Sequence, residues 1–132
     1  MINIYNSIND CIFDSIKQEF KDNNLSDISA AYVSCLLEEK KLDTENNSII
    51  VLYNEIINEP TFNKYQSLGD TCLFREIMFN TNDLNIHFGK VSYYQCYKYT
   101  MYKLELYREL SNNFFIISSI TRNKIFNVEK LK

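Results

Sequence analysis

Asp70 and a run of tyrosines are the residues of this sequence whose types and spacing could do chemistry. Asp70 follows Gly69 inside a segment whose apolar residues repeat at helical spacing. A carboxylate buried there would need hydrogen-bond donors, and the hydroxyls of Tyr93, Tyr94 or Tyr97 could supply them. Three interpretations stay open: a polar network that fixes helix register, a carboxylate used for ligand binding or proton transfer, and an exposed helix residue. We favour the first.

Six tyrosines between residues 93 and 107 are the second chemical feature. Their rings could stack on nucleic-acid bases or line an aromatic pocket. Because a basic surface does not surround these tyrosines, we favour their packing in the core over stacking on bases. Any aromatic rim left exposed would be a site for a protein partner. The candidate binding residues are therefore Asp70, Tyr93, Tyr94, Tyr97 and Tyr102.

The remaining reactive side chains have no motif around them. His87 is the only histidine, in a segment that we expect to be irregular, without a second histidine or cysteine at ligand spacing. We interpret Cys11, Cys35, Cys72 and Cys96 as buried, reduced thiols rather than a disulfide pair or metal site. We predict no catalytic residue, metal site or cofactor, and a non-enzymatic role is favoured over an enzyme.

Composition and charge narrow the class of function. The 132 residues are 45% hydrophobic and 23% charged, with a net charge of −3, which suits one folded domain over residues 1–132. A mildly acidic chain lacks the basic face that nucleic acids require, so we expect no nucleic-acid binding. We also expect no membrane contact and no signal peptide, because no apolar run is long enough and the N-terminus lacks a basic segment. These features predict a cytoplasmic protein.

The stretch from Val91 to Leu110 is the element that would position the tyrosines. Ser92 and Gln95 have the spacing of a capping box that starts a helix. Apolar residues cover most of its circumference, which is typical of a helix surrounded by others. We therefore predict a central Tyr-rich helix at about residues 92–110.

Other helices are expected around this one, because two glycines and one proline are too few for a fold with many tight turns. Gly69, inside one of them, suggests that another helix backbone comes close. Ser111 or Asn112 should interrupt the pattern before the last helix. The prediction is an all-α fold, a compact bundle of five to six helices, with an irregular segment before the central one. The helices are expected at 2–21, 26–41 (capped by Ser26), from Asp43 or Thr44 onward, 60–79 (Pro60 in its first turn), 92–110, and about 113–128.

A resemblance supports this architecture. The segments YQSLGDTCLF, VSYYQCYKYTMY and LYRELSNNFFIISSI resemble an uncharacterised family of small bacterial all-helical proteins that carry an LGD and SYY motif pair. The resemblance covers about the C-terminal half of the chain and implies a bacterial source and a helical fold. It departs at Lys98, where the family has a glycine, and it implies no activity.

The function that these observations favour is a non-catalytic helical protein-interaction module. It would bind a protein partner or its own copy, as a homodimer, through an aromatic or apolar helix surface. A first alternative is a helical-bundle small-ligand binder or enzyme with a pocket lined by Asp70 and the tyrosines. A second is a pathogen or viral protein that occupies a host helix-binding groove.

Overall fold

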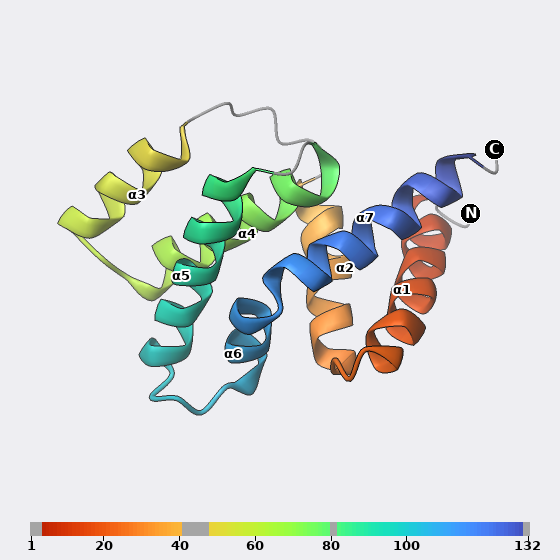
Figure 1. Ribbon diagram of the computed structural model, residues 1–132, viewed down its shortest axis with the longest axis horizontal. Helices are drawn as coiled ribbons and strands as arrows, with labels where there is room; N and C mark the ends of the chain where they lie inside the picture. Colours follow the sequence, from red (N-terminus) through yellow and green to blue (C-terminus); the bar gives the residue numbers. More distant parts are fainter. Residues whose placement is uncertain (1–3, 41–47, 80–81, 131–132) are drawn as a thin grey trace.

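The computed structural model describes residues 4–40, 48–79 and 82–130, and the regular elements in these ranges are all α-helices. The predicted all-α class is confirmed, although seven helices are present within the described ranges instead of five to six. Figure 1 shows α1 (Ile4–Asp22), α2 (Asp27–Lys40), α3 (Ile49–Asn58), α4 (Phe62–Met78), α5 (Asp83–Tyr99), α6 (Glu105–Asn112) and α7 (Phe114–Lys130).

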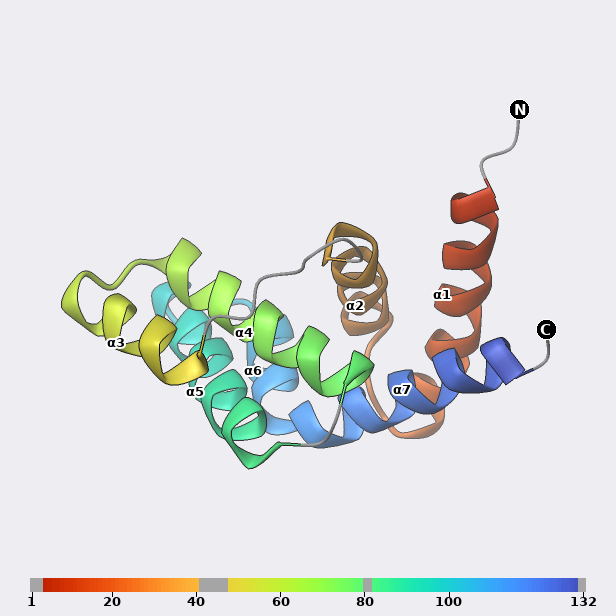
Figure 2. The ribbon, with the colours of Figure 1, turned by 90° about the horizontal axis from the view of Figure 1, so that it is seen from above.

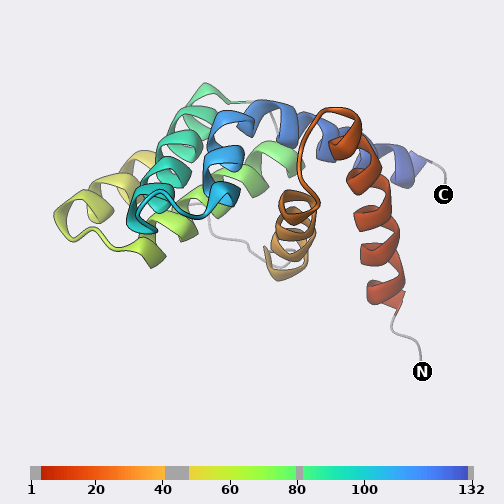
Figure 3. The same cartoon turned by 90° about the horizontal axis from the view of Figure 1, so that it is seen from below.

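The helices α4 and α5 form the most extensive pair, and every other described helix except α1 contacts at least one of them. The helix α3 packs against both, while α6 and α7 cover other parts of α5. The helices α1 and α2 form a hairpin, and α1 otherwise contacts only α7 among the described helices. Figures 2 and 3 show this hairpin standing out from one side of the layer that the later helices form. None of the described helices combines the length and the apolar character needed to cross a bilayer.

Several predicted helix boundaries are found in the structure. The Ser26 hydroxyl accepts from the Ser29 N–H at 3.2 Å, so this serine caps α2 as predicted. The N-cap of α4 is Thr61, whose hydroxyl accepts from the Lys64 N–H, and Pro60 precedes this cap instead of lying in the first turn. The predicted caps of the third helix, Asp43 and Thr44, lie outside the described residues, and the N-cap of α3 is Ser48 instead.

Two glycines allow α4 and α5 to pack closely against large rings. A Cβ atom at Gly69 would lie 2.8 Å from a ring carbon of Tyr93, which is the largest fully buried side chain of the described core. The close approach predicted at Gly69 is present, but a tyrosine ring makes it and not a helix backbone. Gly89 has the same role on α5, where a Cβ atom would meet the ring of Phe114.

The prediction of one central helix at 92–110 is wrong in both of its boundaries. The helix α5 begins at Asp83, capped by Asn82, whose side chain accepts from the Leu84 N–H at 2.8 Å. Most of the segment expected to be irregular is therefore helical, and His87 lies on α5. Ser92, the predicted cap, is buried inside this helix, and its hydroxyl has no hydrogen-bond partner among the described residues.

The second boundary error is a break after Tyr99. Met101 and Tyr102 adopt left-handed backbone conformations, with φ angles of 58° and 60°, and the chain then starts the separate helix α6. The Thr100 hydroxyl donates to the Tyr97 carbonyl at 2.7 Å and accepts from the Leu104 N–H at 3.3 Å. We call residues 99–104 the apolar turn. The interruption predicted at Ser111 or Asn112 lies slightly later, because both residues end α6 and the break before α7 falls at Asn113.

Candidate functional site

Asp70 lies at the centre of a polar network between α2, α4 and α5. Its Oδ1 atom accepts from the Tyr93 hydroxyl at 2.8 Å, which is one of the donors predicted from the sequence. It also accepts from the Tyr32 hydroxyl at 2.6 Å. The Tyr32 ring packs edge-on against those of Tyr93 and Tyr107, and the Tyr107 hydroxyl accepts from Gln66 at 2.8 Å. The network joins helices that are far apart in the sequence.

The electrostatics of this network favour phenols that keep their protons. Burial, and then the negative charge of Asp70, raises the pKa of Tyr32 far above its ordinary value. The same two causes raise the pKa of the fully buried Tyr93. A hydroxyl with such a pKa donates a hydrogen bond at any physiological pH and cannot act as a base. The arrangement can therefore fix the packing of three helices, which is the interpretation favoured from the sequence.

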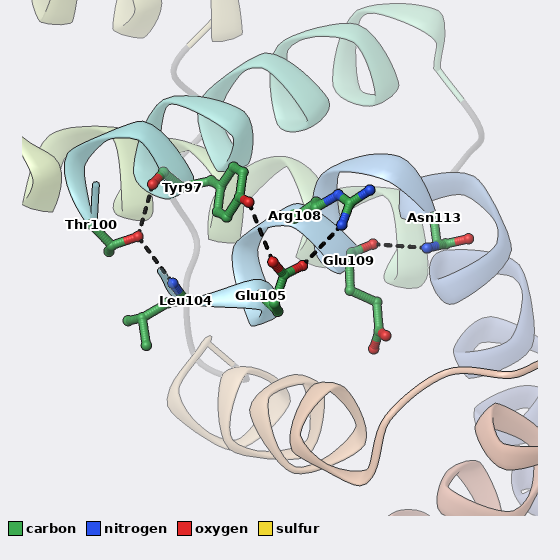
Figure 4. Close-up of polar contacts among 7 residues, drawn as sticks. All are labelled: Tyr97, Thr100, Leu104, Glu105, Arg108, Glu109 and Asn113. Carbon is green, nitrogen blue, oxygen red and sulfur yellow. Dashed lines mark hydrogen bonds and ion pairs between the residues drawn. The ribbon is translucent and has the colours of Figure 1, made fainter. Parts of the chain in front are cut away.

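The structure does not bring the other candidate tyrosines to Asp70. Tyr97 is half-buried, and its hydroxyl donates to Glu105 Oε1 at 3.3 Å; Glu105 Oε2 in turn accepts from Arg108 at 3.2 Å (Figure 4). Tyr94 and Tyr102 are exposed on α5 and the apolar turn. The five candidate residues therefore divide into a core pair, Asp70 and Tyr93, and three residues at or near the surface.

A carboxylate on α6 holds the start of α2. Glu109 Oε1 accepts from the Ser26 N–H at 2.9 Å, from the Ser26 hydroxyl at 2.7 Å, and from the Ser29 hydroxyl. Such a contact satisfies N–H groups that a helix start leaves free, and its negative charge suits the positive end of the helix dipole. The Glu109 and Ser26 positions are 83 residues apart, so no local pattern in the sequence indicates the pair.

A shallow groove of about 180 Å³ runs along the same helix. Its lining residues all carry charged or amide groups, and neither Asp70 nor any predicted tyrosine belongs to it. The lining residues are Glu105, Arg108, Glu109, Asn112 and Asn113.

The thiols fall into two classes. Cys72 and Cys96 are buried and free, and burial raises the pKa of each to about 12. Cys35, which we predicted to be buried, is exposed, and the side chain of Cys11 lies outside the described residues. His87 is exposed on α5 with its ring against Phe88. Within the described residues, no group of three or more histidine, cysteine, aspartate or glutamate residues could hold a metal ion.

Exposed apolar side chains gather in two places, of which the sequence indicated only the first, through Tyr94 and Tyr102. The first is the apolar turn with the neighbouring Tyr94, where the large exposed side chains are Tyr94, Tyr99, Met101, Tyr102 and Leu104. The second is the outer side of α3, where Ile50, Val51 and Ile57 are each about half exposed, at 46%, 52% and 50%. We call these three residues the α3 face. Exposed apolar groups in clusters mark interaction sites more often than single ones do.

Comparison with known proteins finds no significant match to this chain. No family model matches the sequence, and neither the curated proteins nor the solved structures give a significant match. The resemblance to the LGD and SYY family stays a prediction, and the functional argument rests on the geometry of this chain.

Proposed function

We propose that this protein is a non-catalytic helical protein-interaction module that binds a second copy of itself or another protein through the α3 face. The observation that carries this proposal is the two-sided apolar character of α3. Ile49 and Ile56 are buried against the bundle, while Ile50, Val51 and Ile57 point their apolar side chains to solvent. A helix that is apolar on both sides is normally covered on both sides.

The α3 face has the composition of a small helix-packing interface. Covering the exposed halves of three branched aliphatic side chains contributes roughly 2–4 kcal/mol. Asn54 and Asn58 are exposed on the same helix, between Ile50 and Val51 around its circumference, and can hydrogen-bond to a partner there. Ile50 and Ile57 are two helical turns apart, so a partner helix can contact both at once.

The alternative of a ligand pocket at Asp70 has less support. Its Oδ1 atom accepts from two tyrosine hydroxyls, and Tyr93 is fully buried beside it. The groove on α6 does not include this residue. The network therefore has a structural role that explains Asp70 without a ligand.

The decisive experiment is light scattering of the purified chain over a range of concentrations. We expect a dimer for the wild type and a monomer for the double variant Ile50→Ser/Ile57→Ser. The matched control is Ile28→Ser, because Ile28 is an exposed isoleucine on α2, a helix that α3 does not contact. The control should remain dimeric.

If the wild type is a monomer, the same three proteins serve as bait for a foreign partner. A protein that binds the wild type and the Ile28→Ser control, but not the double variant, would support the α3 face. A monomer whose bound proteins are the same for all three baits would refute the proposal.

A further inference from the structure

The apolar turn carries an excess of positive charge although the chain is acidic overall. Lys98 directly precedes it in the sequence, Lys103 lies within it, and both are exposed. The nearest acid in the sequence, Glu105, already accepts from Arg108 and Tyr97. The ammonium group of Lys98 lies 6.0 Å from the centre of the Tyr94 ring. Two lysines without a carboxylate partner among the described residues therefore border an apolar surface, in a chain whose net charge is −3.

The turn is also convex and held in place. Figure 1 shows it at the lower rim of the molecule, at the end of α5 that lies away from α7. Met101 is 73% exposed, more than any other large exposed hydrophobic side chain of the described residues. Left-handed backbone at Met101 and Tyr102 costs about 1–2 kcal/mol for each residue, and the two hydrogen bonds of Thr100 help to hold it.

We propose that the apolar turn docks onto an anionic lipid surface. Met101 and Leu104 would enter the acyl boundary, Tyr99 and Tyr102 would lie at the headgroup level, and Lys98 and Lys103 would face the anionic headgroups. Tyrosine prefers this interfacial depth, and a basic side chain near an anionic surface strengthens binding.

Charge and shape favour a lipid surface over a second copy of the chain. Two copies of the turn placed face to face would bring lysines together. The groove on α6 is lined by charged and amide side chains and offers no apolar pocket for a methionine. A convex tip needs a soft or concave partner, and the bilayer interface accommodates apolar side chains at its surface.

This inference goes beyond the proposed function and uses a different surface. The sequence-based expectation of no membrane contact considered segments that could span a bilayer, whereas this contact needs only a few exposed side chains. Failure of one proposal leaves the other intact, because the α3 face and the turn can be changed separately.

The chain contains no tryptophan, so Tyr102→Trp introduces a single fluorescent reporter at the tip. We would add vesicles of phosphatidylcholine with about 30% phosphatidylserine, and separately vesicles of phosphatidylcholine alone, to the full-length variant. We expect a blue shift of the tryptophan emission with the anionic vesicles, and quenching when the acyl chains carry bromine. Leu84→Trp is the matched control, because Leu84 is exposed in the first turn of α5, at its opposite end.

Charge and apolar contact are then tested on the reporter background. Replacing both Lys98 and Lys103 by glutamine should weaken vesicle binding about 25-fold, because each basic residue contributes about fivefold. Met101→Ser should weaken it about tenfold. Far-UV circular dichroism verifies that each variant is folded. No shift at residue 102, an equal shift at residue 84, equal binding to uncharged vesicles, or binding unchanged by the lysine substitutions would each overturn the proposal.

Discussion

Replacing Asp70 by alanine tests whether the buried network holds the helices together. The change removes the acceptor of the Tyr32 and Tyr93 hydroxyls, which lie 2.6 and 2.8 Å from Oδ1. A hydrogen bond to a charged group contributes about 1.5–3 kcal/mol to stability. Tyr93 is fully buried, so its hydroxyl would be left without this acceptor. The hydroxyl of the less buried Tyr32 can donate to water instead. We expect the free energy of unfolding to fall by about 3–5 kcal/mol, a large part of the ~5–15 kcal/mol typical of a domain.

The measurement is urea unfolding followed by far-UV circular dichroism. Two further variants separate the contributions. Asp70→Asn keeps one acceptor oxygen, replaces the other by an NH2 group and removes the charge, so it should cost about 1–2 kcal/mol. Tyr32→Phe removes one donor and should cost about 1.5–3 kcal/mol. Because the two residues share a hydrogen bond, the double variant Tyr32→Phe/Asp70→Ala should lose less than the sum of the single losses, by about 1–2 kcal/mol.

Two results would refute this reasoning. One is an unfolding free energy of Asp70→Ala within about 0.5 kcal/mol of the wild type, the range of ordinary surface substitutions. The other is strict additivity of the Tyr32 and Asp70 substitutions, which would mean that their hydrogen bond contributes nothing to the folded state.

Three further changes probe the packing around the network. Glu109→Ala should lower the free energy of unfolding by about 1–2 kcal/mol in urea, because the N–H and hydroxyl of the capping residue Ser26 lose their charged acceptor. Gly89→Ala should lower the thermal midpoint, since crowding against a buried ring costs about 1–3 kcal/mol and outweighs the ~1 kcal/mol gain in helix propensity. A thiol reagent should label exposed Cys35 at once but Cys72 and Cys96 only on unfolding. Because their pKa is about 12 in the folded state and 9.0 ordinarily, the unfolded chain releases these protons first, so stability should fall as pH rises from 9.0 to about 12.

The helical class and several helix starts could be predicted because they depend on local chemistry. Ser26 caps α2 through a residue three positions away, and apolar spacing marks the buried side of each helix. A tyrosine donor for Asp70 could be predicted because a buried carboxylate needs donors, but the sequence did not distinguish Tyr93 from Tyr94 and Tyr97. Tyr32, the second donor, is 38 residues from Asp70 and lies in a helix whose packing the sequence does not reveal.

The break after Tyr99 could not be predicted, because the local sequence suits a continuous helix. Its cause is long-range packing. In a straight helix, Tyr107 and Leu110 would extend beyond the end of α5, whereas the fold buries both. The Tyr107 ring then lies 6.1 Å from Tyr32 and 6.3 Å from Tyr93, so the same turn completes the aromatic surround of the Asp70 network.

The energies explain why the strained turn persists. Left-handed backbone at Met101 and Tyr102 costs about 2–4 kcal/mol in total. Burial of Tyr107 and Leu110 contributes roughly 3–6 kcal/mol, and the contact of Glu109 with the start of α2 adds about 1 kcal/mol. The balance favours the break, and its consequence is that the side chains of the turn face solvent. The packing that completes the core is therefore also the reason why the apolar turn is exposed.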